Sequence, residues 1–138
     1  MIIKQVSASI ENRIGSIWQV FQTLADNRIN ILSYSIEDAP EFGTLRLITD
    51  NATKADEVLR QVGYRTQLTR VYAMNVPNET GSMSHILRYL AEQEISIDFM
   101  YAFQYRGISQ TVIHSHDMKK LEQVLIRYEQ EQLSIGAK

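Results

Sequence analysis

The sequence predicts an α+β protein made of two tandem βαββαβ units, each an antiparallel sheet with its helices on one face. Three observations predict this class. The chain of 138 residues repeats itself at a fixed offset, and strand-like and helix-like apolar patterns alternate in the same order in each half. In addition, 44% hydrophobic and 22% charged residues are values typical of a folded globular protein.

The internal repeat is the first of these observations. Gly15-Ser16 aligns without a gap with Gly81-Ser82, an offset of 81 − 15 = 66 residues. The same offset pairs other identical residues: Asn12 with Asn78, Leu24-Ala25 with Leu90-Ala91, Ile29 with Ile95, Ile31 with Ile97, and Val58-Leu59 with Val124-Leu125. Because these matches fall at equivalent points of the apolar pattern, we interpret the chain as two homologous domains, residues 1–70 and 71–138.

The first half shows one complete set of elements. Residues 5–10 alternate between polar and apolar side chains, which predicts a strand with one buried face. Apolar residues at three- and four-residue steps predict an amphipathic helix through Ile17, Trp18, Phe21 and Leu24. Strands are predicted at 29–36, 44–49 and 64–69, with a second helix between Asn51, a favoured N-cap, and Gly63, a favoured terminator. This order is the ferredoxin-like plan.

The second half repeats the order but has an incomplete end. A strand is predicted around residues 72–76, a helix around 83–91, strands around 95–103 and 110–115, and a last helix after Asp117. Only Leu133-Ser134-Ile135 remains for the final strand, which is therefore predicted to be short or missing.

Composition excludes several classes of function. With 14 Lys and Arg against 16 Asp and Glu, the net charge of −2 argues against nucleic-acid binding. The absence of cysteine excludes disulfides and thiolate metal sites. No apolar stretch approaches the roughly 20 residues that span a membrane, so we expect a cytoplasmic protein without a membrane partner.

No catalytic, cofactor or metal constellation is evident in the sequence. Ser16 and Ser82 have no activating acid or base at recognisable spacing, and no phosphate-binding glycine loop occurs, so we expect neither an enzyme nor a cofactor. His114 and His116 have the spacing of two ligands on one strand face, but without an identifiable third ligand we do not expect a metal site.

The segment Glu11-Asn12-Arg13-Ile14-Gly15-Ser16-Ile17, followed by Asn30-Ile31, resembles the ACT domain family. These are small regulatory modules that bind amino acids at domain interfaces. Val76-Pro77-Asn78-Glu79-Thr80-Gly81-Ser82-Met83 is a looser second match. Phe42–Ile48 and Met100–Phe103 add a similarity to stand-alone tandem ACT proteins.

The candidate binding site is the turn from the first strand into the first helix. A helix that begins at a glycine turn presents unpaired N–H groups and a positive dipole end, which suit the carboxylate of an amino acid. The Asn12 amide can hold both polar groups of such a ligand, and the resemblance adds Asn30. The candidate residues are Asn12, Arg13, Ile14, Gly15, Ser16 and Asn30, with Asn78, Gly81 and Ser82 as a secondary set. Two alternatives stay open: Gly15 as a turn glycine only, and Asn12 as a helix cap only.

These observations predict a regulatory protein that senses a free amino acid. Ile10 stands where some relatives that bind small polar amino acids have His, which favours an apolar or aromatic ligand. We expect a homodimer, with a metabolic enzyme subunit as a possible partner. The alternative is a non-catalytic interaction module without a metabolite. An apolar cavity with the Asn12 amide turned away would favour that alternative.

Overall fold

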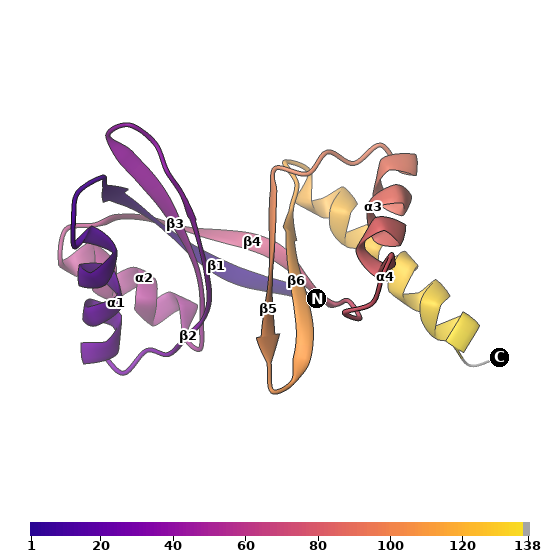
Figure 1. Cartoon of the computed structure of the whole chain (residues 1–138), viewed down its shortest axis with the longest axis horizontal. Coiled ribbons are helices and arrows are strands. Elements are labelled where there is room, and N and C mark those ends of the chain that lie inside the picture. The colour runs from indigo at the N-terminus through magenta and orange to yellow at the C-terminus, as the bar shows by residue number, and fades with distance from the viewer. Residues whose placement is uncertain (137–138) are drawn as a thin grey trace. The chain divides into compact units, whose positions relative to one another are not determined.

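The computed structural model describes residues 1–136 and consists of two compact units (Figure 1). The N-terminal unit is Lys4–Thr69. The C-terminal unit combines Met1–Ile3 with the chain from Arg70 onward. The chain therefore passes between the units twice, after Ile3 and after Thr69.

The N-terminal unit is a four-stranded sheet with two helices on one face (Figure 1). Its strand order is β2-β3-β1-β4, where β1 and β3 are antiparallel with Val6 opposite Leu47. The elements are β1 (Ile2–Glu11), α1 (Ser16–Asp26), β2 (Ile31–Glu37), β3 (Phe42–Thr49), α2 (Ala52–Gln61) and the first part of β4 (Arg65–Asn75). This is the predicted ferredoxin-like order.

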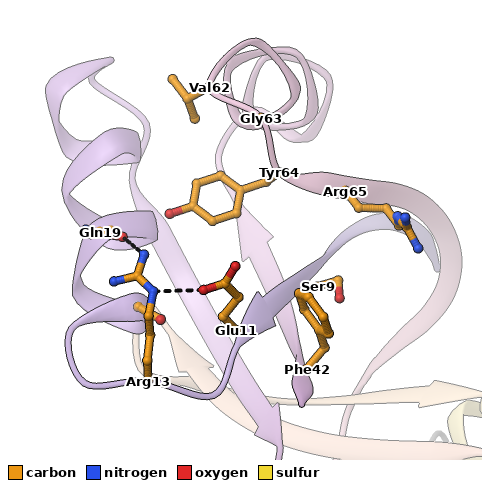
Figure 2. A pocket seen from close by; sticks show the side chains of 10 residues that line it. Ser9, Glu11, Arg13, Gln19, Phe42, Val62, Gly63, Tyr64 and Arg65 are labelled. Atoms are coloured by element: carbon orange, nitrogen blue, oxygen red, sulfur yellow. Dashed lines mark hydrogen bonds and ion pairs between the residues drawn. The ribbon is translucent and has the colours of Figure 1, made fainter.

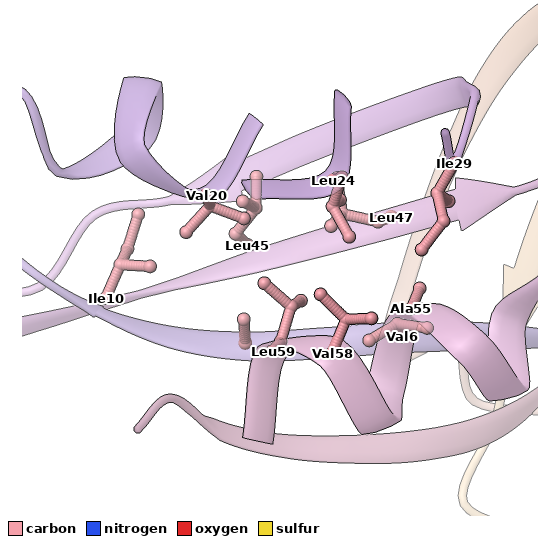
Figure 3. Packing of buried hydrophobic residues seen from close by; sticks show 11 residues of the cluster. Val6, Ile10, Val20, Leu24, Ile29, Leu45, Leu47, Ala55, Val58 and Leu59 are labelled. Atoms are coloured by element: carbon pink, nitrogen blue, oxygen red, sulfur yellow. The ribbon is translucent and has the colours of Figure 1, made fainter. Parts of the chain in front are cut away.

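The core of this unit lies between the helices and the sheet (Figure 3). Leucines 24, 45, 47 and 59 are almost fully buried and pack together with Val6 and Val20. The buried residues of α1 are Ser16, Val20 and Leu24, at four-residue steps. Trp18, predicted to lie on the apolar helix face, is instead 65% exposed in this chain because it lies off that stripe.

The C-terminal unit repeats the plan with α3 (Ser82–Glu92), β5 (Phe99–Tyr105), β6 (Ile108–His114) and α4 (Met118–Gly136). Its strands follow the order β4-β6-β5, and both neighbouring pairs are antiparallel. Tyr72, Ile113, Leu90, Leu121 and Leu125 form the centre of its core.

The final strand of the second half, predicted to be short or missing, does not occur in residues 1–136. Leu133-Ser134-Ile135 belongs to α4, which continues to Gly136. Its place beside β4 is taken by residues from the other end of the chain: the Met1 amino group donates to Ala73 O and the Ala73 N–H donates to Met1 O, both at 2.9 Å. Ile2 packs against the core of this unit.

One further difference concerns the junction of the repeats. The strands predicted at 64–69 and around 72–76 are a single strand, β4, from Arg65 to Asn75. No glycine or proline interrupts this stretch, so nothing in its sequence breaks the extended backbone.

Candidate functional site

The turn between β1 and α1 has the geometry that the sequence predicts. Gly15 precedes the helix in the left-handed region, with φ of 89°. A residue with a side chain is strained at this angle, which explains the glycine. The first turn of an α-helix leaves N–H groups without partners inside the helix, and Ile17 and Trp18 lie in this turn of α1.

A cavity of about 610 Å³ lies beside this turn, within the N-terminal unit (Figure 2). Three segments form its wall: the end of β1 with the start of α1, the start of β3, and the stretch that leads from α2 into β4. The lining residues are Ser9, Glu11, Arg13, Ser16, Gln19, Phe42, Val62, Gly63, Tyr64 and Arg65.

Both signs of charge are present in this cavity. Arg13 Nε lies 3.0 Å from Glu11 Oε2, and Arg13 Nη2 donates to Gln19 Oε1 at 3.1 Å (Figure 2). More than half of the surface of both charged side chains remains exposed, so this ion pair contributes little to stability. A ligand carboxylate can therefore pair with Arg13, and a ligand ammonium with Glu11, at a small cost in free energy for breaking the ion pair.

Ser16 is the most unusual residue of the cavity. It is only 3% exposed, and its Oγ has no hydrogen-bond partner among the described residues. Leaving a buried hydroxyl unpaired costs about 1–3 kcal/mol. A ligand atom that hydrogen-bonds to this hydroxyl would recover that cost.

Some of the predicted site residues lie at this cavity, and others lie elsewhere. Arg13 and Ser16 line the cavity, and Gly15 shapes the turn. Ile14 is fully exposed. Asn12 does not cap the helix: its amide donates to Ala39 O at 3.4 Å, in the loop between β2 and β3. Asn30 lies beyond the other end of α1 and lines a different and smaller depression, which runs along that helix.

Several lining residues were not predicted. Glu11 lies inside the motif, and its charge next to Arg13 was visible in the sequence. Phe42, Val62 and Tyr64 come from segments distant in sequence, and only the fold brings them to the turn.

The C-terminal unit has an equivalent turn with the same geometry. Gly81 has φ of 87°, and the Ser82 N–H donates to Glu79 O at 3.2 Å, as the Ser16 N–H does to Arg13 O. A cavity of about 950 Å³ adjoins it, which Gly81 and Ser82 line and the secondary candidate Asn78 does not. Its far wall is the last part of α4, from Tyr128 to Gly136.

Two hydrogen-bonded pairs hold α4 at this second cavity. The Tyr72 hydroxyl donates to Glu129 Oε1, and His85 Nδ1 lies 2.7 Å from the Tyr128 hydroxyl. Burial raises the pKa of both tyrosines, and the carboxylate of Glu129 raises the pKa of Tyr72 further because it accepts the hydroxyl proton.

The histidines suggested as metal ligands lie elsewhere. His114 Nδ1 is 2.9 Å from Asp98 Oδ2, and its ring stacks on Phe99 with 4.7 Å between centroids. Within residues 1–136, no three His, Asp or Glu side chains are grouped to hold a metal ion.

Comparison with known families agrees with the duplicated architecture. The family model described as an ACT domain pair matches residues 1–134. The chain belongs to this family. A regulatory, ligand-sensing role follows from membership in the ACT domain pair family.

Solved structures include similar chains. Protein BT0572 from Bacteroides thetaiotaomicron is 29% identical, with a TM-score of 0.86 over 94% of this chain and 90% of that one. The regulatory subunit of aspartate kinase from Thermus thermophilus is 17% identical, with a TM-score of 0.61 over 90% of this chain and 93% of that one. The aspartokinase alpha and beta subunits are 16% identical, with a TM-score of 0.57 over 93% and 92%. The last two likenesses show the fold alone. No curated protein matches the sequence.

None of the helices in the described part of the chain is both long and apolar enough to cross a membrane.

Proposed function

We propose that this ACT domain pair senses a free amino acid, which binds in the cavity beside the β1–α1 turn. The observation that supports this most is the buried Ser16 hydroxyl without a partner at the start of a helix, in a cavity that also holds Arg13 and Glu11. Within residues 1–136, no hydrogen bond accounts for that hydroxyl.

The groups of an amino acid match the groups of this cavity. Its carboxylate would bind the Ser16 hydroxyl, the N-terminal N–H groups of α1 and Arg13. Its ammonium would replace Arg13 as the partner of Glu11. Phe42, Val62 and Tyr64 would contact its side chain, which supports the preference for an apolar or aromatic amino acid.

The test is a thermal-shift and calorimetric screen of the common amino acids against the wild-type chain and Ser16→Ala. Loss of a hydrogen bond to a charged ligand group costs about 1.5–3 kcal/mol, so the variant should bind roughly 10- to 150-fold more weakly. The unliganded variant should be as stable as the wild type or more stable, because a buried unpaired hydroxyl is removed.

Thr49→Val is the matched control, because Thr49 Oγ1 is also buried without a partner among the described residues but does not line the cavity. It should leave binding unchanged. Arg13→Gln removes the charge proposed to bind the carboxylate and should also weaken binding. Lys4→Gln is its control, since Lys4 is exposed and lies in the same unit but does not line the cavity. Binding that is equal in Ser16→Ala and the wild type would overturn this placement of the ligand.

One observation favours the alternative, a protein-interaction module. The Asn12 amide is turned to Ala39, and Ile14, Trp18 and Val62 are exposed near the turn. The charged lining of the cavity argues in the opposite direction. If no amino acid stabilises the protein, the interaction module becomes the better proposal.

The resemblance to ACT proteins supports three further parts of the proposal, which concern location, oligomeric state and target. The chain would act in the cytoplasm as a homodimer, and its target would be a metabolic enzyme subunit. Ligand binding would change that association only through different affinities for the two states.

A further inference from the structure

The two cavities occupy equivalent places in the two units but differ in their side chains. The 66-residue offset aligns Val6 with Tyr72, Gln19 with His85, Val62 with Tyr128 and Gly63 with Glu129. All four residues of the C-terminal unit are polar or titratable, and they form the two hydrogen-bonded pairs Tyr72–Glu129 and His85–Tyr128. His85, Tyr128 and Glu129 line the cavity.

The exchange of glycine for glutamate also explains the shape of the second cavity. Gly63 follows α2 with φ of 98°, a conformation that ends a helix. Glu129, at the same position, continues α4, whose last turns then form a wall that the first cavity does not have. The same residue provides a carboxylate at the base of that wall.

The second cavity carries negative charge without the arginine that balances it in the first. Glu11 and Arg13 of the first cavity align with Pro77 and Glu79, so the arginine is lost at this position. Among the described residues that line the second cavity there is no Lys or Arg, and Glu129 alone carries a carboxylate. Glu129 is half-buried and has no ion pair with a side chain in residues 1–136. Its negative charge acts on the Met1 amino group, but no ion pair joins the two.

Apolar side chains from β4, α3 and α4 line the cavity together with this carboxylate. Met74 lies on β4 and Pro77 follows that strand, Ile86 lies on α3, and Leu133 lies on the last part of α4. Leu133 is 75% exposed although it borders a cavity, which leaves apolar surface for an additional molecule.

We propose that this second cavity binds a ligand with a protonated primary amine on an apolar body, and that Glu129 receives the amine. The ligand would be an apolar or aromatic amino acid or the corresponding amine without a carboxylate. The amine pairs with the Glu129 carboxylate while the apolar body packs against Met74, Ile86 and Leu133. A purely structural role explains why Tyr72 holds Glu129, but it does not explain a cavity of about 950 Å³ beside the pair.

The experiment uses the methyl group of Met74 as a local reporter. Of the five methionines, Met74 lines the second cavity, and the first cavity contains none. The full chain, labelled with ¹³C at its methionine methyl groups, is titrated with phenethylamine, phenylalanine and 3-phenylpropionate. A Met74→Leu sample assigns the signal.

We expect phenethylamine or phenylalanine to shift the Met74 signal and 3-phenylpropionate to leave it unchanged. Whichever of the two amines binds more tightly identifies the source of the ligand. Glu129→Gln, whose amide oxygen still accepts from Tyr72, should weaken binding at least tenfold. The control Glu122→Gln removes the same charge from the same helix, on the side that pairs with Arg70, and should not.

Circular dichroism of both variants establishes that they fold. Equal binding of 3-phenylpropionate and phenethylamine would show an apolar cavity without a role for Glu129 and overturn the proposal. So would equal affinity of Glu129→Gln and the wild type, or the absence of any Met74 shift. Ser16→Ala should bind these ligands at Met74 as the wild type does, so failure here is distinguishable from failure of the first site.

Discussion

The burial of Tyr72 and its hydrogen bond to Glu129 make the chain less stable at alkaline pH, because both raise the pKa of this tyrosine. Tyr72 is almost fully buried, and its pKa is raised above the usual value of about 10 by burial and by the hydrogen bond to Glu129. As pH rises past 10, the unfolded chain loses this proton first. The unfolded state then binds fewer protons than the folded state, so the free energy of unfolding falls.

We therefore predict that stability is maintained below about pH 10 and declines as pH rises toward the folded pKa of Tyr72. Tyr72→Phe should reduce this decline, whereas Tyr105→Phe, an exposed control, should not. Urea unfolding at pH 9, 10 and 11 measures the effect. A decline of equal steepness in Tyr72→Phe and the wild type would contradict the prediction.

Single residues were predictable where the backbone restricts the choice of side chain. Gly15 and Gly81 were found from the sequence because a positive φ before a helix favours glycine so strongly. Asn12 was equally prominent, yet its amide is directed to a loop 27 residues away. No local rule determines where a polar side chain finds its partner once the fold offers several.

The length of α4 depends on position 129. The helix has 19 residues. Its equivalent α2 has 10 and ends at Gln61, two residues before Gly63 with its positive φ. Glycine costs about 1 kcal/mol in a helix interior, and substitution here would also remove the bond to Tyr72. Glu129→Gly should therefore shorten α4.

Hydrogen exchange measures this effect. In Glu129→Gly, the amides of residues 131–136 should lose protection while those of residues 121–125 keep theirs. Gln130→Gly tests the propensity effect alone, since Gln130 is exposed on the same turn. If both variants lose protection equally, the pairing with Tyr72 has no part in extending the helix.

The sequence predicted the type and order of the elements with strong apolar periodicity, but it did not predict where each element ends. The order of strands and helices follows directly from the apolar pattern, but the sequence did not predict that α4 continues through Leu133-Ser134-Ile135, where only a short or missing strand was expected. The information was present in the alignment of Gly63 with Glu129. The effect of Glu129 on the helix depends on its hydrogen bond with Tyr72, which lies 57 residues away in the sequence.

The first three residues of the chain, Met1–Ile3, belong to the C-terminal unit. These residues complete the sheet of the C-terminal unit, although the rest of β1 belongs to the N-terminal unit. Ile2 packs against the C-terminal core, so Ile2→Asp would place a charge at its edge. We expect a loss of about 2 kcal/mol or more in the stability of that unit.

The measurement is again hydrogen exchange. Ile2→Asp should reduce the protection of β4 and β6 near Ala73 and Val112, which are opposite each other. Lys4→Asp, two residues away, exposed and in the other unit, should leave these amides unchanged. Unaltered protection in Ile2→Asp would show that this strand contributes little to the C-terminal unit.

The sequence offered no indication that Met1–Ile3 belong to the C-terminal unit. The alternation of residues 5–10 identifies the strand but not the sheet in which each of its ends lies. The 66-residue repeat predicts two halves with the same elements, and it carries no sign that a strand of one half also serves the other.

The interleaved strands also have a consequence for the order of events during synthesis. Met1 and Ala73 are joined by hydrogen bonds across 72 residues, so the C-terminal sheet needs residues made long before its own helices. Closing so large a loop is slow. Until Ala73 has left the ribosome, Met1–Ile3 therefore lack their partner strand, while the remaining residues of β1 already have theirs in the first half.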